Sequence, residues 1–397
     1  MRRLRNDLPY TFRPPKPSAW FRPLGLLGNR HFFLKRQYNL SSITSTGFDD
    51  VRKLSAAGHS IVLAPNHADH SDPHVMMEVT SRHQLKALFM GAREIFEVSP
   101  SACFALQAMG VFSVDRDGPD IAAIKTAITL LEKGGDPLII YPEGEIYHHH
   151  ERLDPLHEGV ASILLKAAAR LKQDREAFLV PVAIRFHHQP EVEATFSPRL
   201  SKLEDRIGWT PKPNLPTDDR ILRLASGILA LKETEFLGHA GNGGIQERLT
   251  QLCESLLANT ESRHSRDPKA LTPPERVRAL RYRIRRRLLD AEKPPTPAEK
   301  ITLLDDLDRV FTALQAHSYI GDYLLGDPTL NRRAETILKL EEDLFGFPTY
   351  PTPRTVHVTA APPIPVSQMI RTAQLPPKGS ATDLTNLLEK SLSALLT

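Results

Sequence analysis

The order of apolar segments in residues 50–186 is the feature that most constrains how this chain folds. Short apolar runs with strand character alternate with stretches whose apolar residues recur every three or four positions. Such alternation is typical of a largely parallel sheet covered by helices. The predicted strands are 60–66, 85–90, 111–114, 137–144 and 178–184. The sequence therefore predicts an α/β fold, with a largely parallel sheet flanked by helices.

After about residue 205 the pattern changes to helical periodicity broken by proline-rich segments. Strand-like alternation returns at 355–366. We therefore expect a mainly helical insertion in the C-terminal half, followed by a strand that rejoins the core sheet. The expected organisation is a basic arm at 1–45, an α/β core at 46–205, a helical insertion at 206–350, the returning strand at 351–370, and a linker and helix at 371–397.

The chain has 397 residues, which is enough for two globular units, because one hydrophobic core usually stops growing at roughly 250–300 residues. Its two cysteines, Cys103 and Cys253, are too few for a disulfide framework and indicate a reducing compartment. No apolar run reaches the roughly 20 residues of a spanning helix. The N-terminus MRRLRNDLPY also lacks the apolar core of a secretory signal. We expect a cytoplasmic protein without a transmembrane helix.

The first 38 residues are strongly basic, with nine lysines and arginines and one acidic residue, Asp7. Aromatic residues are interleaved with these charges, namely Trp20, Phe21, Phe32 and Phe33. This mixture is typical of segments that lie on an anionic membrane surface, so a peripheral membrane surface is one expected partner. A solvated arm is the alternative interpretation. Nucleic acid is not expected as a partner, because no recognition motif accompanies the charge.

The densest group of chemically active side chains is NHADHSDP at 66–73, directly after a predicted buried strand. Open α/β sheets place their ligand sites at this end of a strand. His67 titrates near neutral pH and can act as a general base, while Asp72 can accept the other ring N–H and fix the tautomer. Asp72 followed by Pro73 also fits the N-cap of a helix. The two roles for Asp72 are compatible.

Three further blocks follow in order, each beside a predicted strand: GVFSVDR at 110–116, YPEG at 141–144 and VPVAI at 180–184. Together with 66–73 they make four ordered blocks, which are far more specific than any one of them. This succession resembles the four sequence blocks of the glycerolipid acyltransferases, the family of lysophosphatidate and glycerol-phosphate acyltransferases. The resemblance covers roughly residues 50–186 and the late strand.

The resemblance implies phospholipid biosynthesis by transfer of a fatty acyl group from acyl-coenzyme A or acyl-carrier protein to a hydroxyl of a lysolipid or glycerol-phosphate-like acceptor. His67 would deprotonate the hydroxyl and Asp72 would orient His67. No acyl-enzyme is implied, and the chain contains no GxSxG motif. Arg116 would contact an anionic group of the acceptor, and Glu143 and Gly144 would shape the acceptor pocket. Neither a metal nor a cofactor other than the acyl donor is implied.

The third block departs from the family pattern. Where the family continues PEG with Thr and Arg, this chain has Glu145 and Ile146. One expected cation is missing and an extra acid stands in its place, which puts a glycerol-phosphate headgroup in doubt because Glu145 would repel a phosphate. Arg152 can substitute for the missing cation if the loop folds back. Otherwise we expect an acceptor with less negative charge, or a different lipid alcohol or amine.

Two other functions stay open. The segment HADHSDPH concentrates side chains that bind zinc or manganese and favours a metal-dependent hydrolase, although its order matches no metal motif. A non-catalytic lipid-binding protein on the membrane surface is favoured by the basic N-terminus and by a predicted helix near 274–289 that carries seven arginines. This last function predicts that His67→Ala leaves activity intact.

Overall fold

The computed structural model describes residues 8–118, 120–172, 174–264, 271–326, 328–376 and 379–396. The described residues form two compact units. The α/β unit lies within 12–115, 120–189 and 350–397, and the helical unit lies within 8–11, 116–118 and 190–349. Arg2, Arg3, Arg5 and Asp7 of the basic N-terminus lie outside the described residues.

The α/β unit is built on one sheet, whose described strands have the order β1-β7-β6-β2-β5-β3-β4, with β8 paired to β6. The strands are β1 Leu40–Thr46, β2 Ser60–Pro65, β3 Leu88–Ala92, β4 Val111–Val114, β5 Leu138–Ile139, β6 Ala177–His188, β7 Arg354–Ala360 and β8 Ile364–Pro365. The strands from β6 to β4 in this order are parallel, whereas β7 is antiparallel to β6 and parallel to β1. The predicted α/β fold with a largely parallel sheet is confirmed.

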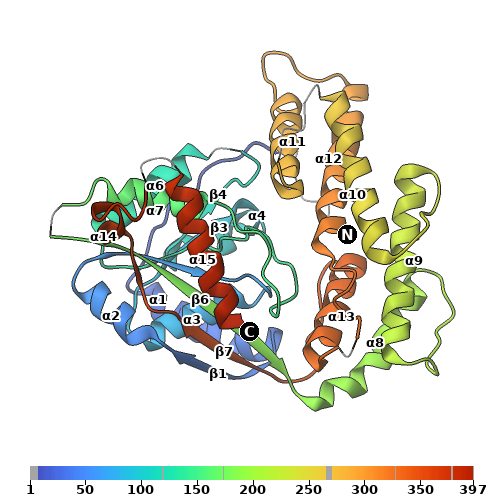
Figure 1. The fold of residues 1–397 in the computed structure, drawn as a ribbon, viewed down its shortest axis with the longest axis horizontal. Helices are drawn as coiled ribbons and strands as arrows, with labels where there is room; N and C mark the ends of the chain where they lie inside the picture. Colours follow the sequence, from blue (N-terminus) through green and yellow to red (C-terminus); the bar gives the residue numbers. More distant parts are fainter. Residues whose placement is uncertain are drawn as a thin grey trace. The chain divides into compact units, whose positions relative to one another are not determined.

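Helices cover the sheet (Figure 1). All six residues of β2 are buried, and successive side chains of a strand point to opposite faces. Val62 and Ala64 of β2 share a hydrophobic core with α6 (Ile121–Lys133), α7 (Gly159–Ala168) and α15 (Ser380–Leu396). The other helical segments of this unit are α1 Phe21–Gly28, the π-helix η1 Asn29–Gln37, α2 Phe48–Ala56, α3 Asp72–Arg82, α4 Arg93–Phe96, α5 Pro100–Ala108 and α14 Val366–Arg371.

The helical unit contains η2 Pro190–Val192, α8 Glu193–Arg206, α9 Thr217–Leu237, α10 Ile245–Arg263, α11 Pro273–Leu288, α12 Pro297–Ser318 and α13 Leu330–Phe345. The prediction of a mainly helical C-terminal half is confirmed. The starts of α11 and α12 follow from sequence, because Thr272 with Glu275 and Thr296 with Glu299 form capping boxes. No helix in the described part of the chain has the length and apolar composition needed to cross a membrane.

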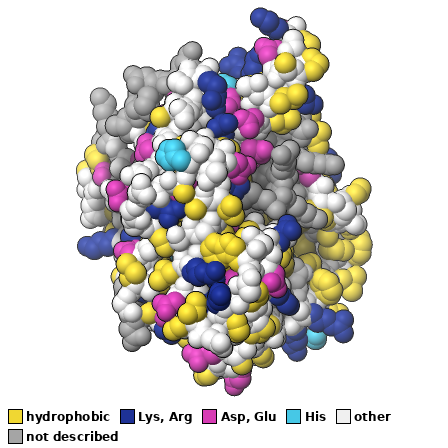
Figure 2. Space-filling model, turned by 90° about the vertical axis from the view of Figure 1, so that its right-hand side faces the viewer, with side chains coloured by type: hydrophobic (Ala, Val, Ile, Leu, Met, Phe, Trp, Pro, Cys, Tyr) yellow, Lys and Arg dark blue, Asp and Glu magenta, His cyan; other side chains and the backbone are white. Residues whose placement is uncertain are grey.

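Four buried carboxylates of the helical unit are each paired with an arginine. Glu204, Glu233, Glu261 and Glu341 bond to Arg220, Arg248, Arg276 and Arg199, respectively, with closest N–O distances of 2.6–2.8 Å. On the face shown in Figure 2, basic and acidic side chains are also interspersed rather than segregated. Opposite charges in contact offset much of the desolvation that burial imposes on each of them.

Candidate active site

The turn after β2 is held to the neighbouring strand by Asn66. Its side-chain amide donates to the backbone oxygen of Ile184 (3.1 Å), and the Ile184 N–H donates to Asn66 Oδ1 (2.7 Å). Ile184 lies on β6, so one side chain makes the two hydrogen bonds that a further strand residue would otherwise make. The main chain therefore leaves the sheet at a fixed point, immediately before His67.

His67 and Asp72 are in direct contact. His67 Nδ1 lies 2.9 Å from Asp72 Oδ2, with the Asp72 side chain fully buried and the His67 side chain 13% exposed. A carboxylate oxygen accepts, so Nδ1 carries the proton in this pair and Nε2 is the ring nitrogen that can act as a base. The alternative role of Asp72 as a helix N-cap is wrong: Ser71 occupies that position and Asp72 is the first residue of α3.

The hydrogen bonds of the Asp72 carboxylate offset only part of the free-energy cost of burying its charge. Burial raises its pKa well above the usual value, and the nearby carboxylate of Asp69 raises it further. Hydrogen bonds from backbone N–H groups act in the opposite direction; the N–H of Asp69 donates to Asp72 Oδ2 (2.9 Å). A positive charge that forms on His67 would relieve this unfavourable burial, which is the electrostatic condition for an effective general base.

Asp69 belongs to a second buried cluster that sequence reasoning did not find. Its Oδ2 accepts hydrogen bonds from Arg354 Nη1 (2.9 Å) and the Tyr350 hydroxyl (3.1 Å), and its Oδ1 accepts from the backbone N–H of Ser71 (2.8 Å). The Arg354 guanidinium holds the pKa of Asp69 well below its usual value even though burial alone would raise it. This cluster fixes the turn that carries His67.

Residues of the YPEG block enclose His67 from another side. The backbone N–H of His67 donates to Glu143 Oε1 (2.6 Å), and the Tyr141 ring stacks on the His67 ring at a centroid distance of 4.1 Å. Glu143 is buried, and burial raises its pKa well above the usual value. Gly144 has φ +75°, and an added Cβ would lie 3.0 Å from the ring of His157. This backbone conformation and the close ring favour glycine at this position.

The structure brings together four of the five site residues predicted from sequence: His67, Asp72, Glu143 and Gly144 lie in the α/β unit. Arg116 instead lies in the segment that groups with the helical unit. Its neighbour Asp117 is buried and bonds to two arginines of α11, at 2.7 Å from Arg281 Nε and 3.0 Å from Arg285 Nη1. These ion pairs lie within the helical unit, and the sequence did not predict them.

Three of the candidate metal ligands in HADHSDPH have separate hydrogen-bond partners. Asp72 bonds to His67, Asp69 bonds to Arg354, and His74 Nδ1 lies 2.5 Å from Asn29 Oδ1. Burial lowers the pKa of His74 to about 4, so this ring is neutral at physiological pH. These contacts favour a hydrogen-bonded turn over a shared metal site for these side chains.

Comparison with known protein families decides between these alternatives. Residues 42–185 match the model of the Acyltransferase family. This part of the chain is an acyltransferase domain. The matched range begins within β1, ends within β6, and contains His67, Asp72, Arg116 and the YPEG block. No curated protein matches the chain.

The family match establishes the enzyme class at the family level, which is acyl transfer in glycerolipid metabolism. It implies an acyl donor and an acceptor as substrates. The resemblance to the glycerolipid acyltransferases is therefore confirmed over residues 42–185. The acyltransferase match ends at residue 185, before η2 and the helices α8 to α13. Except for residues 116–118, the described helical unit therefore lies outside the matched range.

Proposed function

We propose that this acyltransferase moves a fatty acyl group from acyl-coenzyme A or acyl-carrier protein to a hydroxyl of a lysolipid or glycerol-phosphate-like acceptor, with His67 as the general base. The observation that carries the proposal is the 2.9 Å contact between His67 Nδ1 and the fully buried Asp72 carboxylate. A carboxylate in this position stabilises the imidazolium that forms when the ring takes a proton.

The reaction follows from this arrangement. Nε2 of His67 accepts the proton of the acceptor hydroxyl, and the oxygen attacks the carbonyl carbon of the thioester. The C–S bond breaks, and the leaving thiolate takes the proton back from His67. The products are an ester and a free thiol, so the enzyme returns to its starting state without an acyl-enzyme. Glu143 acts by holding the backbone of His67 in place.

The test is acyl transfer by His67→Ala, assayed with a panel of lysolipid acceptors and both kinds of acyl donor. We expect turnover to fall by about a hundredfold or more, because a positioned general base contributes 10²–10⁴ in rate. His239→Ala is the matched control, since this exposed histidine lies between α9 and α10. Retained turnover in His67→Ala would refute the proposal and favour a non-catalytic lipid-binding role.

For the acceptor, we propose that Arg116 contacts an anionic group and that Glu143 and Gly144 shape the pocket. Glu145 and Ile146 stand where the family has Thr and Arg, so the acceptor carries less negative charge than glycerol phosphate unless Arg152 supplies the missing cation. Assays that compare lysophosphatidate with neutral lysolipids test this point. Clear preference for lysophosphatidate would contradict an acceptor of reduced charge.

We propose that the reaction takes place in the cytoplasm, at a membrane surface. The free thiols of Cys103 and Cys253 support a reducing compartment. A lipid acceptor resides in a bilayer, and the basic N-terminal segment is suited to its anionic face. We also propose that the helical unit is an insertion in the acyltransferase core. This organisation is supported by β7, which follows the helical unit in sequence and pairs with β6.

A further inference from the structure

Exposed apolar side chains of the α/β unit are concentrated in two segments. Among its described residues, seven large apolar side chains are more than half exposed, and six of them lie in residues 20–32 and 98–104. The six are Val98 (71%), Trp20 (68%), Leu24 (59%), Phe32 (55%), Phe104 (53%) and Leu27 (52%). Isolated exposed apolar residues are ordinary on a protein surface, but a concentration of them marks an interaction site.

The two segments are in contact and form one surface. The ring centroids of Trp20 and Phe104 lie 6.5 Å apart, and those of Phe21 and Phe104 lie 5.3 Å apart. Helix α1 rests on this region through Gly25, where an added Cβ would lie 2.3 Å from the sulfur of Met109. Among the described residues, Leu24 and Leu27 of α1 (FRPLGLLG) are each more than half exposed, and no residue of this helix is buried. Burial of the exposed apolar face of such a helix, away from water, is energetically favourable.

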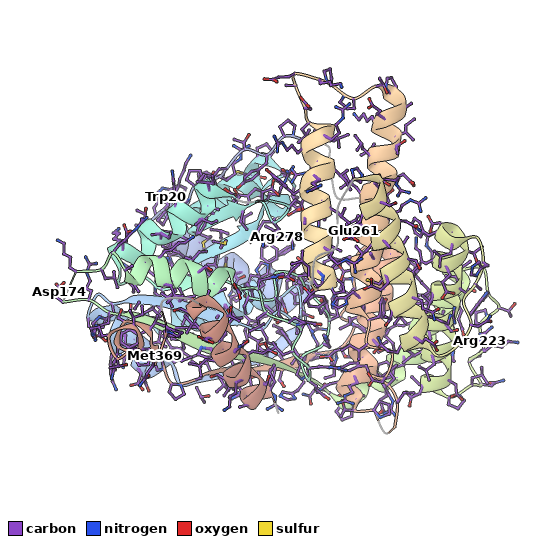
Figure 3. All side chains as sticks on the ribbon, turned by 45° about the horizontal axis from the view of Figure 1, so that its top comes forward. Trp20, Asp174, Arg223, Glu261, Arg278 and Met369 are labelled. Atoms are coloured by element: carbon purple, nitrogen blue, oxygen red, sulfur yellow. The ribbon has the colours of Figure 1, made fainter. Side chains whose placement is uncertain are left out.

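An open cleft of about 680 Å³ borders this surface, between the chain before α1 and the segment from α4 to α5. Trp20, Val98 and Phe104 contribute apolar walls, while Arg13 and Lys16 are exposed cations on its edge. Trp20 is labelled in Figure 3. The exposed cations Lys35 and Arg36 follow at the end of η1. Apolar groups and exposed cations thus occur on the same segments.

We propose that α1, η1, the loop at Val98 and α5 form a surface, here called the docking surface, that inserts into the headgroup region of an anionic lipid bilayer. A tryptophan beside leucines suits the boundary between headgroups and acyl chains, and neighbouring lysines and arginines suit lipid phosphates. Helix α1 has eight residues, too few to span a bilayer, so it lies in the plane of the interface.

This inference deepens the proposed function, because it rests on an acceptor that resides in a membrane. It extends the basic N-terminal segment to a defined surface that includes α5, a helix far from that segment in sequence. The two segments bind as one unit, and a change in either of them weakens membrane binding. Charge draws the protein to the bilayer, and burial of the leucine and aromatic side chains holds it there.

The test is sedimentation of the full chain with vesicles of phosphatidylcholine alone or of phosphatidylcholine mixed with phosphatidylglycerol. We expect binding to the mixed vesicles, weakened by salt. Leu24→Glu with Leu27→Glu should reduce binding at least about tenfold, since each exposed leucine loses its burial in the bilayer. Phe104→Glu should also reduce it. Ile301→Glu is the matched control, because Ile301 is 70% exposed but lies on α12 of the helical unit.

Three outcomes would overturn the inference. The wild-type chain fails to bind the mixed vesicles, the docking-surface variants bind as tightly as Ile301→Glu, or light scattering shows a dimer that the variants dissociate, which assigns the surface to a second copy of the chain. Failure of the proposed reaction is separable from these results. His67→Ala should bind vesicles like the wild type, and Leu24→Glu with Leu27→Glu should retain turnover on a water-soluble, short-chain acceptor.

Discussion

Two buried carboxylates of the helical unit have different partners from two buried carboxylates at the acyltransferase site. In the helical unit, Glu204 and Glu233 each accept hydrogen bonds from an arginine side chain, at distances down to 2.6 Å. In the α/β unit, Asp72 and Glu143 are bonded by the ring of His67 and by backbone N–H groups. Glu204 and Glu233 are therefore neutralised by arginine, whereas the hydrogen bonds of Asp72 and Glu143 come from a histidine ring and from backbone N–H groups.

The pKa values follow this difference in partners. Burial alone would raise the pKa of Glu204 and of Glu233, but hydrogen bonds from arginine bring both below the usual value. For Asp72 and Glu143, burial is the largest effect and both pKa values rise well above the usual value. A buried carboxylate matched by a cation serves structure, and one left unmatched beside a histidine is available for chemistry.

The largest expected effect is on catalysis. Asp72→Asn removes the charge that stabilises a positive His67, so turnover should fall by about 10²–10⁴. The midpoint of thermal unfolding should change little, because the amide keeps the shape of the side chain. Initial rates and circular dichroism melts check both statements. Asp49→Asn, at a side chain that is 80% exposed, is the control. A loss of turnover of less than tenfold would contradict a catalytic role for the unmatched charge of Asp72.

In the helical unit, removal of a buried carboxylate should lower stability and leave turnover unchanged. Glu204→Ala leaves Arg220 buried without its carboxylate, and we expect a loss of about 3–5 kcal/mol in the free energy of unfolding. Turnover per folded molecule should stay at the wild-type value. Denaturant titration and rates at a temperature where both proteins are folded provide the measurements. Glu235→Ala, which removes an exposed pair with Lys232, should cost no more than about 1 kcal/mol.

The pH dependence of stability should separate the two classes of carboxylate. The pKa of Glu143 is raised, so its contribution to the free energy of unfolding is present at low pH and is lost as the pH rises through the raised value. Glu143→Gln should therefore gain stability relative to wild type as the pH rises. The pKa of Glu204 is lowered, so the wild type should lose its advantage over Glu204→Gln as the pH falls.

These slopes are measured by denaturant unfolding between about pH 2 and pH 8, a range that extends below the ordinary glutamate pKa of about 4.3 for Glu204 and above it for Glu143. Opposite slopes for the two variants, each relative to wild type, are the expected result. Parallel slopes would mean that the pKa values of Glu143 and Glu204 are shifted in the same direction. This result would contradict the proposed difference between the two sites.

The smallest expected effect is the effect of metal chelation on turnover. A metal ion near the site would supply the positive charge that Asp72 and Glu143 lack, and the contrast between the units would then have another explanation. We expect EDTA to leave turnover unchanged and the purified protein to contain no stoichiometric zinc or manganese. Activity that disappears with chelator and returns with added metal would instead favour the metal-dependent hydrolase.

Most of the sheet could be predicted because its strands are buried and therefore apolar. All six residues of β2 are buried, which explains why 60–66 is recognisable from sequence. Strand β1 (LSSITST) escaped notice because it lies at the edge of the sheet and has one buried residue, Leu40. An exposed edge strand has no need of the apolar residues that identify a strand in sequence. The predicted strand at 137–144 is also longer than β5, since the YPEG residues form a turn.

The site could be predicted where its residues are neighbours in the chain. His67 and Asp72 are five positions apart, and one turn brings them into contact. Arg354 is 285 positions from Asp69, so its pairing depends on the fold of the whole sheet. Tyr141 belongs to a block that was noted for Glu143 and Gly144, and its stacking on His67 required the three-dimensional structure. The spacing along the chain therefore predicted the reacting groups. The residues that hold them in place, such as Arg354 and Tyr141, come from distant segments and could not be predicted in this way.

The bond between Arg354 and Asp69 determines when, during synthesis of the chain, the active site can form. A ribosome releases the N-terminal part of the chain first, and β7 emerges only after the helical unit has been translated. Until then Asp69 has no guanidinium partner and the place of β7 between β1 and β6 is empty. We therefore expect nascent chains that lack β7 to be incapable of acyl transfer, so that activity begins only after β7 has been synthesised.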